Sequence, residues 1–496
     1  MSRPDVVVIG SGMGGATLAA ALAPSGARIL ILERGERLRP SPDDRDEAAI
    51  FARGAFRPRE EWLDGQGRAF NPGNYYHVGG NTKFYGAVLM RYRAEDFSPV
   101  AHAGGRTPGW PISYDTLEPF YSAAETLYRV RGALGDDPTE PPHSTPYAYA
   151  PVPHEPAIAD LAKRLAAVGL HPAPIPLGVD IDRWLAGGNT PWDAFPDTCG
   201  GKMDAETVGL TAALAHDNVT LRTGCRVVGL RTDGSGRITD VRLESGETIG
   251  ARIVVLAAGA VQSAALLLAS GDERHPRGLA NGSDQVGRNF MNHNTSAVLA
   301  LHPLRRNTAI YQKTLMFNDF YLGGGPGDTP MGNVQMLGKI SGTILAANSA
   351  LPAVAARWIA ARALDFYAMS EDLPDPESRV TLRGGQIVLD WKRSNQKAHD
   401  ALVRALKSAL RRAGFPILLS RGFDRRTPSH QCGTARMGRD PAKSVVNTDC
   451  RSHDHPNLYI ADASVLPTSA AVNPSLTVAA LALRTARHIE RSALAT

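Results

Sequence analysis

The stretch VVVIGSGMGGATLAAALAPSGARILILE, residues 6–33, carries the strongest signal of the fold. A β-branched run at residues 5–9 leads into a glycine-rich turn. An alanine-rich segment typical of a helix follows and ends at Gly26, and a second apolar run ends at Glu33. Strand, helix and strand in this order predict a compact βαβ unit at the start of the chain.

The turn Gly10-Ser11-Gly12-Met13-Gly14-Gly15 is a GxGxxG motif that follows a strand and opens a helix. Gly10 allows the tight turn, Gly12 lets a pyrophosphate approach the backbone, and Gly15 lets the helix pack closely on the sheet. The start of the helix offers unpaired N–H groups to phosphates, and Glu33 can accept hydrogen bonds from ribose hydroxyls. The motif predicts a dinucleotide cofactor, but it does not separate NAD from FAD.

Composition narrows the class of protein. The length of 496 residues allows about two to four domains. Hydrophobic residues make up 43% of the chain and charged residues 21%, which is ordinary for a soluble globular protein. The 54 basic and 49 acidic residues give a net charge of +5 and are scattered, so we expect no nucleic-acid partner.

Targeting and metal signals are also weak. The N-terminus lacks the features of a signal peptide, and no apolar stretch without charges is long enough to span a membrane. We therefore expect a cytoplasmic protein with no transmembrane segment. The four cysteines form no CxxC or paired zinc spacing, so we expect neither a metal site nor an attached haem.

Periodicity predicts several further elements. Residues 113–130 read as an amphipathic helix capped by Ser113 or Asp115, and residues 131–156 read as a proline-rich connector. Residues 219–258 read as three strands, of which the first covers residues 219–232 and the last is buried on both faces. The remaining predictions are a helix at 260–270, a strand at 457–463 and a helix from residue 475.

Two later segments allow two interpretations each. In VGGNTKFYG, residues 78–86, the adjacent glycines either bring backbone N–H groups against a flat or anionic group or belong to a surface loop. In NPSLT, residues 473–477, Asn473 and Pro474 make a good helix start. The start of that helix can also face an acceptor that becomes anionic, such as the N1–C2=O edge of a reduced flavin.

Together with HQCGTARMG, residues 430–438, these segments resemble the glucose-methanol-choline (GMC) oxidoreductases. The resemblance covers nearly the whole chain, and its pieces occur in the family's order. The forms HxxGTxRMG and NPxLT are most similar to those of bacterial sugar-oxidising branches, which include pyranose-oxidase-like and sugar-dehydrogenase-like enzymes. Three more segments complete the resemblance: AAGAVQSAALLLASG (257–271), VGRNFMNH (286–293) and NLYIADASVLPTSAAVNPSLT (457–477).

The resemblance implies an α/β fold with two interleaved domains. A Rossmann-like FAD-binding domain would take residues 1–92, 196–290 and 444–496. A substrate-binding domain, built on an antiparallel sheet with helices, would take residues 93–195 and 291–443.

The resemblance also implies which residues bind FAD. Some members bond FAD covalently through a histidine just after the glycine pair, but Phe84 stands near that place, so we expect non-covalent FAD. His77 is the alternative attachment point. Ala264 replaces the proline usual in the second family signature. The residues expected to contact FAD are Gly10, Gly12, Gly14, Gly15, Glu33, Arg34, Gly79, Gly80, Asn81, Thr82, Gly86, Ala87, Val227, Ala258, Gly259, Asp462, Ala463, Asn473, Pro474 and Thr477.

Local sequence leaves the role of His430 open. It could ligate a metal, pair with Cys432 as a nucleophile, or accept a proton. The resemblance assigns it as the active-site histidine, with Asn473 as its partner in place of the second histidine of other members. We expect His293 to be a structural, hydrogen-bonding histidine.

These assignments imply oxidation of an alcohol C–OH, most simply of a sugar, glycoside or polyol. Flavin N5 can accept the hydride, and a neutral imidazole such as that of His430 has the right pKa range to take the proton. The electron acceptor would be O₂, a quinone or a separate redox protein. The alternatives are a lyase of the hydroxynitrile-lyase type on the same scaffold and a non-catalytic FAD-binding protein.

Overall fold

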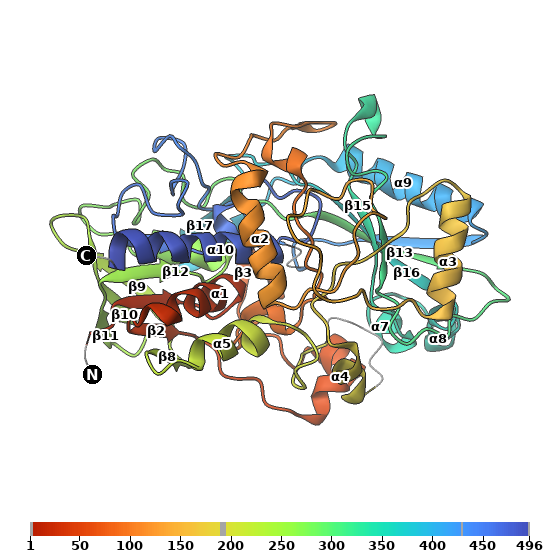
Figure 1. Ribbon diagram of the computed structural model, residues 1–496, viewed down its shortest axis with the longest axis horizontal. Coiled ribbons are helices and arrows are strands. Elements are labelled where there is room, and N and C mark those ends of the chain that lie inside the picture. Colours follow the sequence, from red (N-terminus) through yellow and green to blue (C-terminus); the bar gives the residue numbers. More distant parts are fainter. Residues whose placement is uncertain (1–2, 189–194, 428–429, 495–496) are drawn as a thin grey trace.

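The computed structural model describes residues 3–188, 195–427 and 430–494. One part of the molecule surrounds a parallel sheet and carries both α1 (Met13–Leu22) and α10 (Ser475–Ile489), although these helices come from opposite ends of the chain (Figure 1). The other part surrounds an antiparallel sheet covered by α9 (Gln396–Arg412) and α3 (Pro156–Ala167).

The parallel sheet contains the βαβ unit predicted at the start of the chain. Its strand order is β20-β12-β1-β2-β8. All of its pairs are parallel, with Val6 opposite both Ile29 and Ile253. Its central strands are buried on both faces, which explains their continuous apolar runs. The strands are β1 (Val6–Ile9), β2 (Ile29–Leu32), β8 (Val219–Arg222), β12 (Ile253–Leu256) and β20 (Leu458–Ile460).

One predicted strand is wrong. Residues 219–232 were expected to form a single strand, but the chain turns at Gly224, whose φ is 63°. The first part becomes β8 at the edge of the parallel sheet, and the second becomes β9 (Val227–Thr232) in a separate sheet. This second sheet is antiparallel and adds β10 (Ile238–Leu243) and β11 (Thr248–Gly250).

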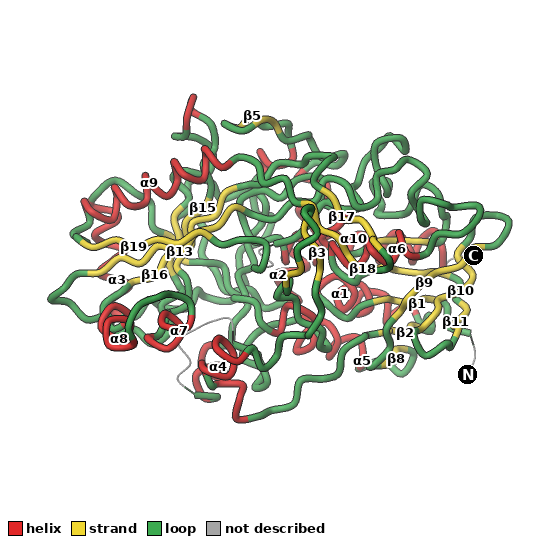
Figure 2. The backbone as a smooth tube through the Cα atoms, turned by 180° about the vertical axis from the view of Figure 1, so that it is seen from behind, coloured by secondary structure: helices red, strands yellow, loops and turns green. Residues whose placement is uncertain are grey.

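The antiparallel sheet has the strand order β19-β13-β16-β15-β14-β7. Alternate residues of β13 face opposite layers: Val298 packs in a cluster with α9 and α3, whereas Leu299 packs with Ile344 of α7 (Gly342–Ala347). Figure 2 shows α9 and α7 on the two sides of this sheet. The strands are β7 (Ala173–Pro174), β13 (Asn294–Leu301), β14 (Leu315–Phe317), β15 (Asn333–Met336), β16 (Leu364–Ser370) and β19 (Ile417–Gly422).

One of the smaller sheets combines strands from distant segments of the chain. The order β17-β18-β3-β4 combines β17 (Arg379–Arg383) and β18 (Gln386–Asp390) with β3 (Trp62–Asp64) and β4 (Ala69–Phe70). A two-stranded sheet contains β5 (Ala101–His102) and β6 (Gly105–Arg106).

The large sheets follow the predicted division of the chain. Every strand of the parallel sheet comes from the segments predicted to bind FAD, and every strand of the six-stranded sheet comes from the other segments. The four-stranded sheet, however, draws strands from both sets of segments. The domain boundaries themselves stay a prediction.

The structure tests two predictions about which residues cap the starts of helices. Ser113, rather than Asp115, caps α2 (Tyr114–Leu127) and accepts from Thr116 N at 3.3 Å. In α10 the cap position belongs to Pro474, so the expected Asn473 cap is wrong. Among the described residues, no helix is long and apolar enough to cross a membrane. The other helices are α4 (Ile181–Ala186), α5 (Thr211–Leu214), α6 (Ala260–Ala269) and α8 (Ala353–Ala360).

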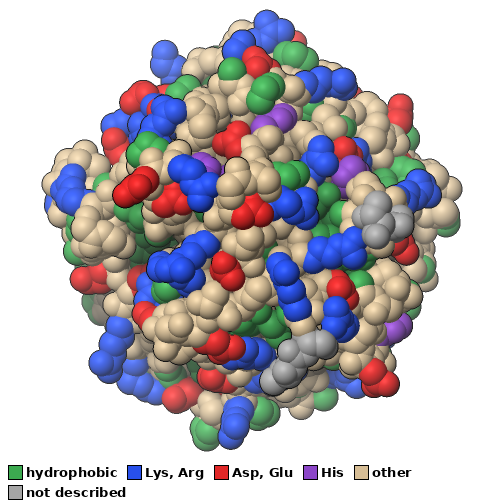
Figure 3. Space-filling model, turned by 90° about the vertical axis from the view of Figure 1, so that its left-hand side faces the viewer, with side chains coloured by type: hydrophobic (Ala, Val, Ile, Leu, Met, Phe, Trp, Pro, Cys, Tyr) green, Lys and Arg blue, Asp and Glu red, His purple; other side chains and the backbone are tan. Residues whose placement is uncertain are grey.

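Charge is mixed on the surface as it is in the sequence. Figure 3 shows the face at the parallel-sheet end, where Lys and Arg side chains are interspersed with Asp and Glu. Salt at physiological concentration screens such exposed charges beyond about 8–10 Å.

Candidate active site

Two glycine-rich segments far apart in the sequence meet at the carboxyl ends of β1 and β2. Gly79 N donates to Ser11 Oγ at 3.1 Å, and the same hydroxyl donates to Glu33 Oε2 at 2.6 Å. A Cβ on Gly80 would lie 3.5 Å from Gly12 Cα. Ser11 therefore joins the two segments. Sequence reasoning missed it because it occupies a variable position of the motif.

Glu33 is buried at the end of β2. Besides the Ser11 hydroxyl, its carboxylate accepts from Ser11 N at 3.0 Å and from Gly35 N at 2.8 Å. Burial raises the pKa of this carboxyl group, and these hydrogen bonds oppose the rise. A carboxylate has about four lone-pair sites, so Glu33 can still accept from a ribose hydroxyl.

The start of α1 fits a pyrophosphate. It has no side-chain cap and no acidic residue in its first turn, so its first N–H groups lack an acceptor from a capping side chain. A Cβ on Gly14 would lie 1.6 Å from Ala461 O, so this glycine is required by packing on the end of β20. By contrast, a Cβ on Gly12 would meet only Gly79 O, at 4.0 Å. Gly12 therefore borders open space, as expected for a glycine that a phosphate approaches.

Asp462 links two strands of the parallel sheet. Its Oδ2 accepts from Gly259 N at 2.9 Å and Ser263 Oγ at 2.5 Å, and its Oδ1 accepts from Ser464 N at 2.9 Å and Ser464 Oγ at 2.5 Å. The carboxylate thus ties the turn after β12 to the end of β20. Its expected contact with FAD stays a prediction, because these four bonds give the group a structural role.

Several other predicted FAD residues also make bonds within the protein. Thr82 Oγ1 donates to Gly79 O, Thr477 Oγ1 bonds the Tyr121 hydroxyl, and the Arg34 guanidinium lies 3.8 Å from the Tyr76 ring centre. The remaining positions are Asn81 in the turn Gly80–Lys83, Gly86 and Ala87 in the loop after it, Val227 at the start of β9, Ala258 beside Gly259, Ala463 after Asp462, and Pro474 before α10.

His430 and Asn473 lie together, as the resemblance implied. Asn473 Nδ2 is 3.2 Å from His430 Nε2. On the other side of the ring, His430 Nδ1 is 2.8 Å from His293 Nδ1. Met291 and Cys432 form an antiparallel bridge, and counting two residues from each places His293 opposite His430. His293 is therefore a hydrogen-bonding histidine as expected, but its partner is the candidate catalytic residue.

The surroundings of His430 favour the neutral imidazole. Burial lowers its pKa well below the usual 6.5, and the neighbouring His293 and Lys313 lower it further. A neutral ring at ordinary pH can accept a proton, whereas a charged ring cannot. The backbone of His430 has a φ of 71°, an uncommon conformation that is found at functional sites.

The alternatives for His430 find little support. Cys432 is 1% exposed, and burial raises the pKa of its thiol well above the usual range, which opposes a nucleophilic thiolate. His453 and His455 bond to Ser444 Oγ and Gly236 O respectively. No group of three potential metal ligands occurs within residues 3–188, 195–427 and 430–494.

A further residue at the site carried no sequence signal. Gln335 of β15 donates to Asn473 Oδ1 at 2.9 Å and thereby turns the Asn473 amide nitrogen toward His430. This contact depends on the register of the antiparallel sheet, which no local motif reveals.

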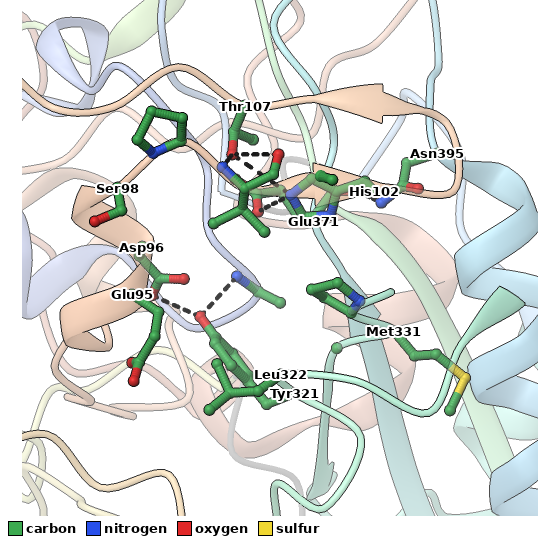
Figure 4. A pocket seen from close by; sticks show the side chains of 16 residues that line it. Glu95, Asp96, Ser98, His102, Thr107, Tyr321, Leu322, Met331, Glu371 and Asn395 are labelled. Carbon is green, nitrogen blue, oxygen red and sulfur yellow. Dashed lines mark hydrogen bonds and ion pairs between the residues drawn. The ribbon is translucent and has the colours of Figure 1, made fainter. Parts of the chain in front are cut away.

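A cavity of about 400 Å³ lies beside the loop that carries Asn473. Figure 4 shows Asp96 and Glu371 in its wall, with the Tyr321 hydroxyl bonded to Asp96 and to a backbone nitrogen, that of Ala471. Burial raises the pKa of Asp96 to about 6 and that of Glu371 well above its usual range. The buried Asn395 Oδ1 in the wall has no hydrogen-bond partner. The cavity therefore presents carboxyl groups to an incoming ligand.

Comparisons with known proteins agree with this geometry. A GMC oxidoreductase model matches residues 374–482, and an FAD dependent oxidoreductase model matches residues 5–282. The chain is 33% identical to the 6'''-hydroxyparomomycin C oxidase of Streptomyces lividus, over 98% of this chain and 91% of that protein. It is 28% identical to the fructose dehydrogenase large subunit of Gluconobacter japonicus, over 98% of this chain and 97% of that protein.

The solved structure of pyridoxine 4-oxidase from Mesorbium loti has the same fold. It aligns with a TM-score of 0.67 at 21% identity and covers 99% of both chains. The expected fold, with a parallel FAD-binding sheet and an antiparallel substrate-domain sheet, is confirmed.

Gly12→Ala and Gly14→Ala separate cofactor contact from packing. The Gly14 variant forces a Cβ onto Ala461 O and is expected to lose about 1–3 kcal/mol of stability or more. The Gly12 variant has room in the apoprotein, so its melting temperature should stay near wild type while its FAD content falls. Thermal unfolding of the apoproteins and flavin absorbance per mole of protein measure the two effects. Normal FAD retention by Gly12→Ala would contradict the assigned phosphate position.

Proposed function

The chain belongs to the GMC oxidoreductase family and is an FAD-dependent enzyme that oxidises alcohol groups; we propose that its substrate is a sugar, glycoside or polyol and that His430 takes the hydroxyl proton. The pair of His430 and Asn473 supports this proposal most directly. The similarity to a fructose dehydrogenase and to an oxidase supports a sugar-oxidising branch. The acceptor, whether O₂, a quinone or a separate redox protein, stays a prediction, as does a cytoplasmic location.

The side chains at the site suit removal of a proton from a hydroxyl group. FAD, when bound, supplies the hydride acceptor. Asn473 Nδ2 now donates to His430 Nε2, and a substrate hydroxyl placed between them would donate to the imidazole and accept from the amide. Such a preorganised donor contributes about 2–4 kcal/mol as negative charge develops on the oxygen.

We propose that FAD is bound without a covalent link. Phe84, near the place of the attachment histidine in some members, is buried and stacks on Tyr75 with ring centres 3.7 Å apart. Its hydrocarbon ring offers no nucleophile. Denaturation of the purified protein should therefore release all flavin into the supernatant, and flavin that stays with the precipitate would point to His77.

An anaerobic visible spectrum tests the function. Sugars, glycosides and simple alcohols are added in turn to the holoenzyme, and bleaching of the flavin band identifies a substrate. Re-admitting air then distinguishes an oxidase from a dehydrogenase by how fast the colour returns. If cyanohydrins are cleaved while the flavin stays oxidised, the lyase alternative replaces the proposal.

The pH profile follows from the lowered pKa of His430. Its free base persists as the pH falls below 6.5, because burial and the neighbouring His293 and Lys313 disfavour the charged ring. The acid limb of kcat/KM for flavin reduction should therefore lie below pH 6.5. An acid limb centred at 6.5 or above would show that His430 is not the titrating base.

An amino-bearing sugar is a second candidate, favoured by the cavity of Figure 4. Its carboxyl groups would accept from an ammonium group, and the similarity to the 6'''-hydroxyparomomycin C oxidase supports this class. An ammonium group beside Glu371 would lower the raised pKa of this carboxyl group and favour its ionised form. Glu371→Gln keeps an acceptor for Ala470 N but cannot ionise.

This candidate makes a selective prediction. Glu371→Gln should lower kcat/KM for glucosamine by about tenfold or more, since hydrogen bonds to charged groups contribute about 1.5–3 kcal/mol, and should leave glucose unaffected. Glu273→Gln, at an exposed position that does not line this cavity, is the matched control. An equal effect of Glu371→Gln on both sugars would remove the amino-sugar candidate.

A further inference from the structure

Two chains of hydrogen bonds converge on His430, and each begins at a group that can only accept. The first begins at the Ser469 carbonyl oxygen, which lies 3.0 Å from His293 Nε2. A carbonyl has no proton to give, so neutral His293 carries its proton on Nε2 and its Nδ1 is an acceptor. His430 Nδ1, 2.8 Å away, must then carry a proton. The lone pair of His430 is thereby left on Nε2.

A doubly protonated His293 would reverse this arrangement, but its surroundings oppose that state. His293 is 1% exposed, and burial lowers its pKa to about 4. The Ser469 carbonyl oxygen also accepts from the Tyr92 hydroxyl at 2.8 Å, and this second hydrogen bond helps to hold the carbonyl in place. His293 is consequently a neutral acceptor toward His430 throughout the ordinary pH range.

The second chain begins at the carboxylate of Asp137. Asp137 Oδ2 accepts from Asn318 Nδ2 at 2.6 Å, and Asn318 Oδ1 accepts from Asn333 Nδ2 at 2.6 Å. Gln335 Nε2 donates to Asn333 Oδ1 at 3.2 Å and to Asn473 Oδ1 at 2.9 Å. Turning any one of these amides would place two acceptors or two donors against each other, so the carboxylate orients the whole chain.

Both chains of hydrogen bonds end at His430, and both require that its Nε2 be an acceptor. Because Asn473 Oδ1 faces Gln335, its Nδ2 faces His430 Nε2, which must accept. The chain from Ser469 independently leaves the lone pair on that nitrogen. Arg93 contacts Asp137 at 2.5 Å and so helps to hold the carboxylate in place at the start of the second chain.

We propose that His293 and Gln335 are positioning residues that hold His430 in the tautomer with the proton on Nδ1, so that Nε2 is free to accept the proton of the substrate hydroxyl. This proposal rests on the proposed role of His430. The other neutral tautomer carries its proton on Nε2 and has no lone pair there, so it cannot act as a base toward the substrate. Neither His293 nor Gln335 needs to touch the substrate to have this effect.

A pair of variants at position 293 tests the acceptor role. In His293→Asn the amide oxygen can take the place of Nδ1 and still accept from His430, whereas His293→Leu offers no acceptor. His399→Leu is the matched control: His399 is also buried, bonds Ser296 and Ser370 through its two ring nitrogens, and has a pKa lowered to about 4. All three variants remove a buried imidazole, but only two of them change the partner of His430.

Flavin reduction by substrate under anaerobic conditions is measured on the holoenzymes, corrected for bound FAD. His293→Leu should lower the limiting rate constant by about tenfold or more, less than the complete loss of a general base because the Asn473 amide still favours a bare Nε2. The substrate concentration at half saturation should change little. His293→Asn should recover most of the rate. His399→Leu should affect stability but leave the rate per bound flavin near wild type.

Nitrogen NMR of histidine-labelled holoenzyme reads the tautomer without any turnover. His430, assigned by the signals that vanish in His430→Gln, should show a protonated Nδ1 and a bare Nε2 in the wild type. In His293→Leu the opposite tautomer should become populated beside the first, because only the Asn473 amide then still favours a bare Nε2. If His293→Leu does not fold, Gln335→Met tests the second chain by the same two measurements.

A protonated Nε2 in the wild type would overturn the proposal. So would a His293→Leu or Gln335→Met holoenzyme with unchanged tautomer and unchanged rate. Failure of the proposed function looks different: the wild type would then bind FAD but no alcohol would reduce it, whereas the tautomer could still be read.

Discussion

The antiparallel pairing of Met291 with Cys432 is the constraint on which the candidate site depends. Both backbone hydrogen bonds of this bridge are 3.0 Å, and the register places His293 opposite His430. The close approach requires Gly433, where a Cβ would lie 2.3 Å from Asn289 O. These main-chain hydrogen bonds therefore decide where the candidate base lies.

The two halves of the molecule contribute different parts of the chemistry. The carboxyl ends of the parallel strands gather the glycine turn and Glu33, which suit phosphates and ribose hydroxyls. The antiparallel sheet instead places Asn333 and Gln335, two residues apart on β15, on one face toward Asn473. Through these amides a continuous chain of hydrogen bonds crosses from this sheet to the loop before α10.

Local patterns predicted local features well. The βαβ unit follows from residues 6–33 alone, and the family motifs placed His430 and Asn473 together. The division of residues 219–232 into two strands was missed, because apolar periodicity does not say which sheet a strand joins. The cap assigned to Asn473 was wrong for a related reason: the same side chain serves equally well in a cap and in a tertiary network.

Ser11, His293 and Gln335 show the limit of the sequence more sharply. Each acts through a partner that is 22 to 138 residues away, at Glu33, His430 and Asn473 respectively. No spacing rule links such pairs, since their contact is created by sheet register and by the meeting of loops. Only the folded chain reveals that the candidate base has a partner on each ring nitrogen.

Whether His430 accepts the hydroxyl proton is tested by anaerobic single-turnover flavin reduction in His430→Ala, with an alcohol that reduces the wild-type enzyme. We expect full FAD content and a rate constant lower by about 10²- to 10⁴-fold, the usual contribution of a general base. A rate constant close to that of the wild type, with FAD bound, would contradict it.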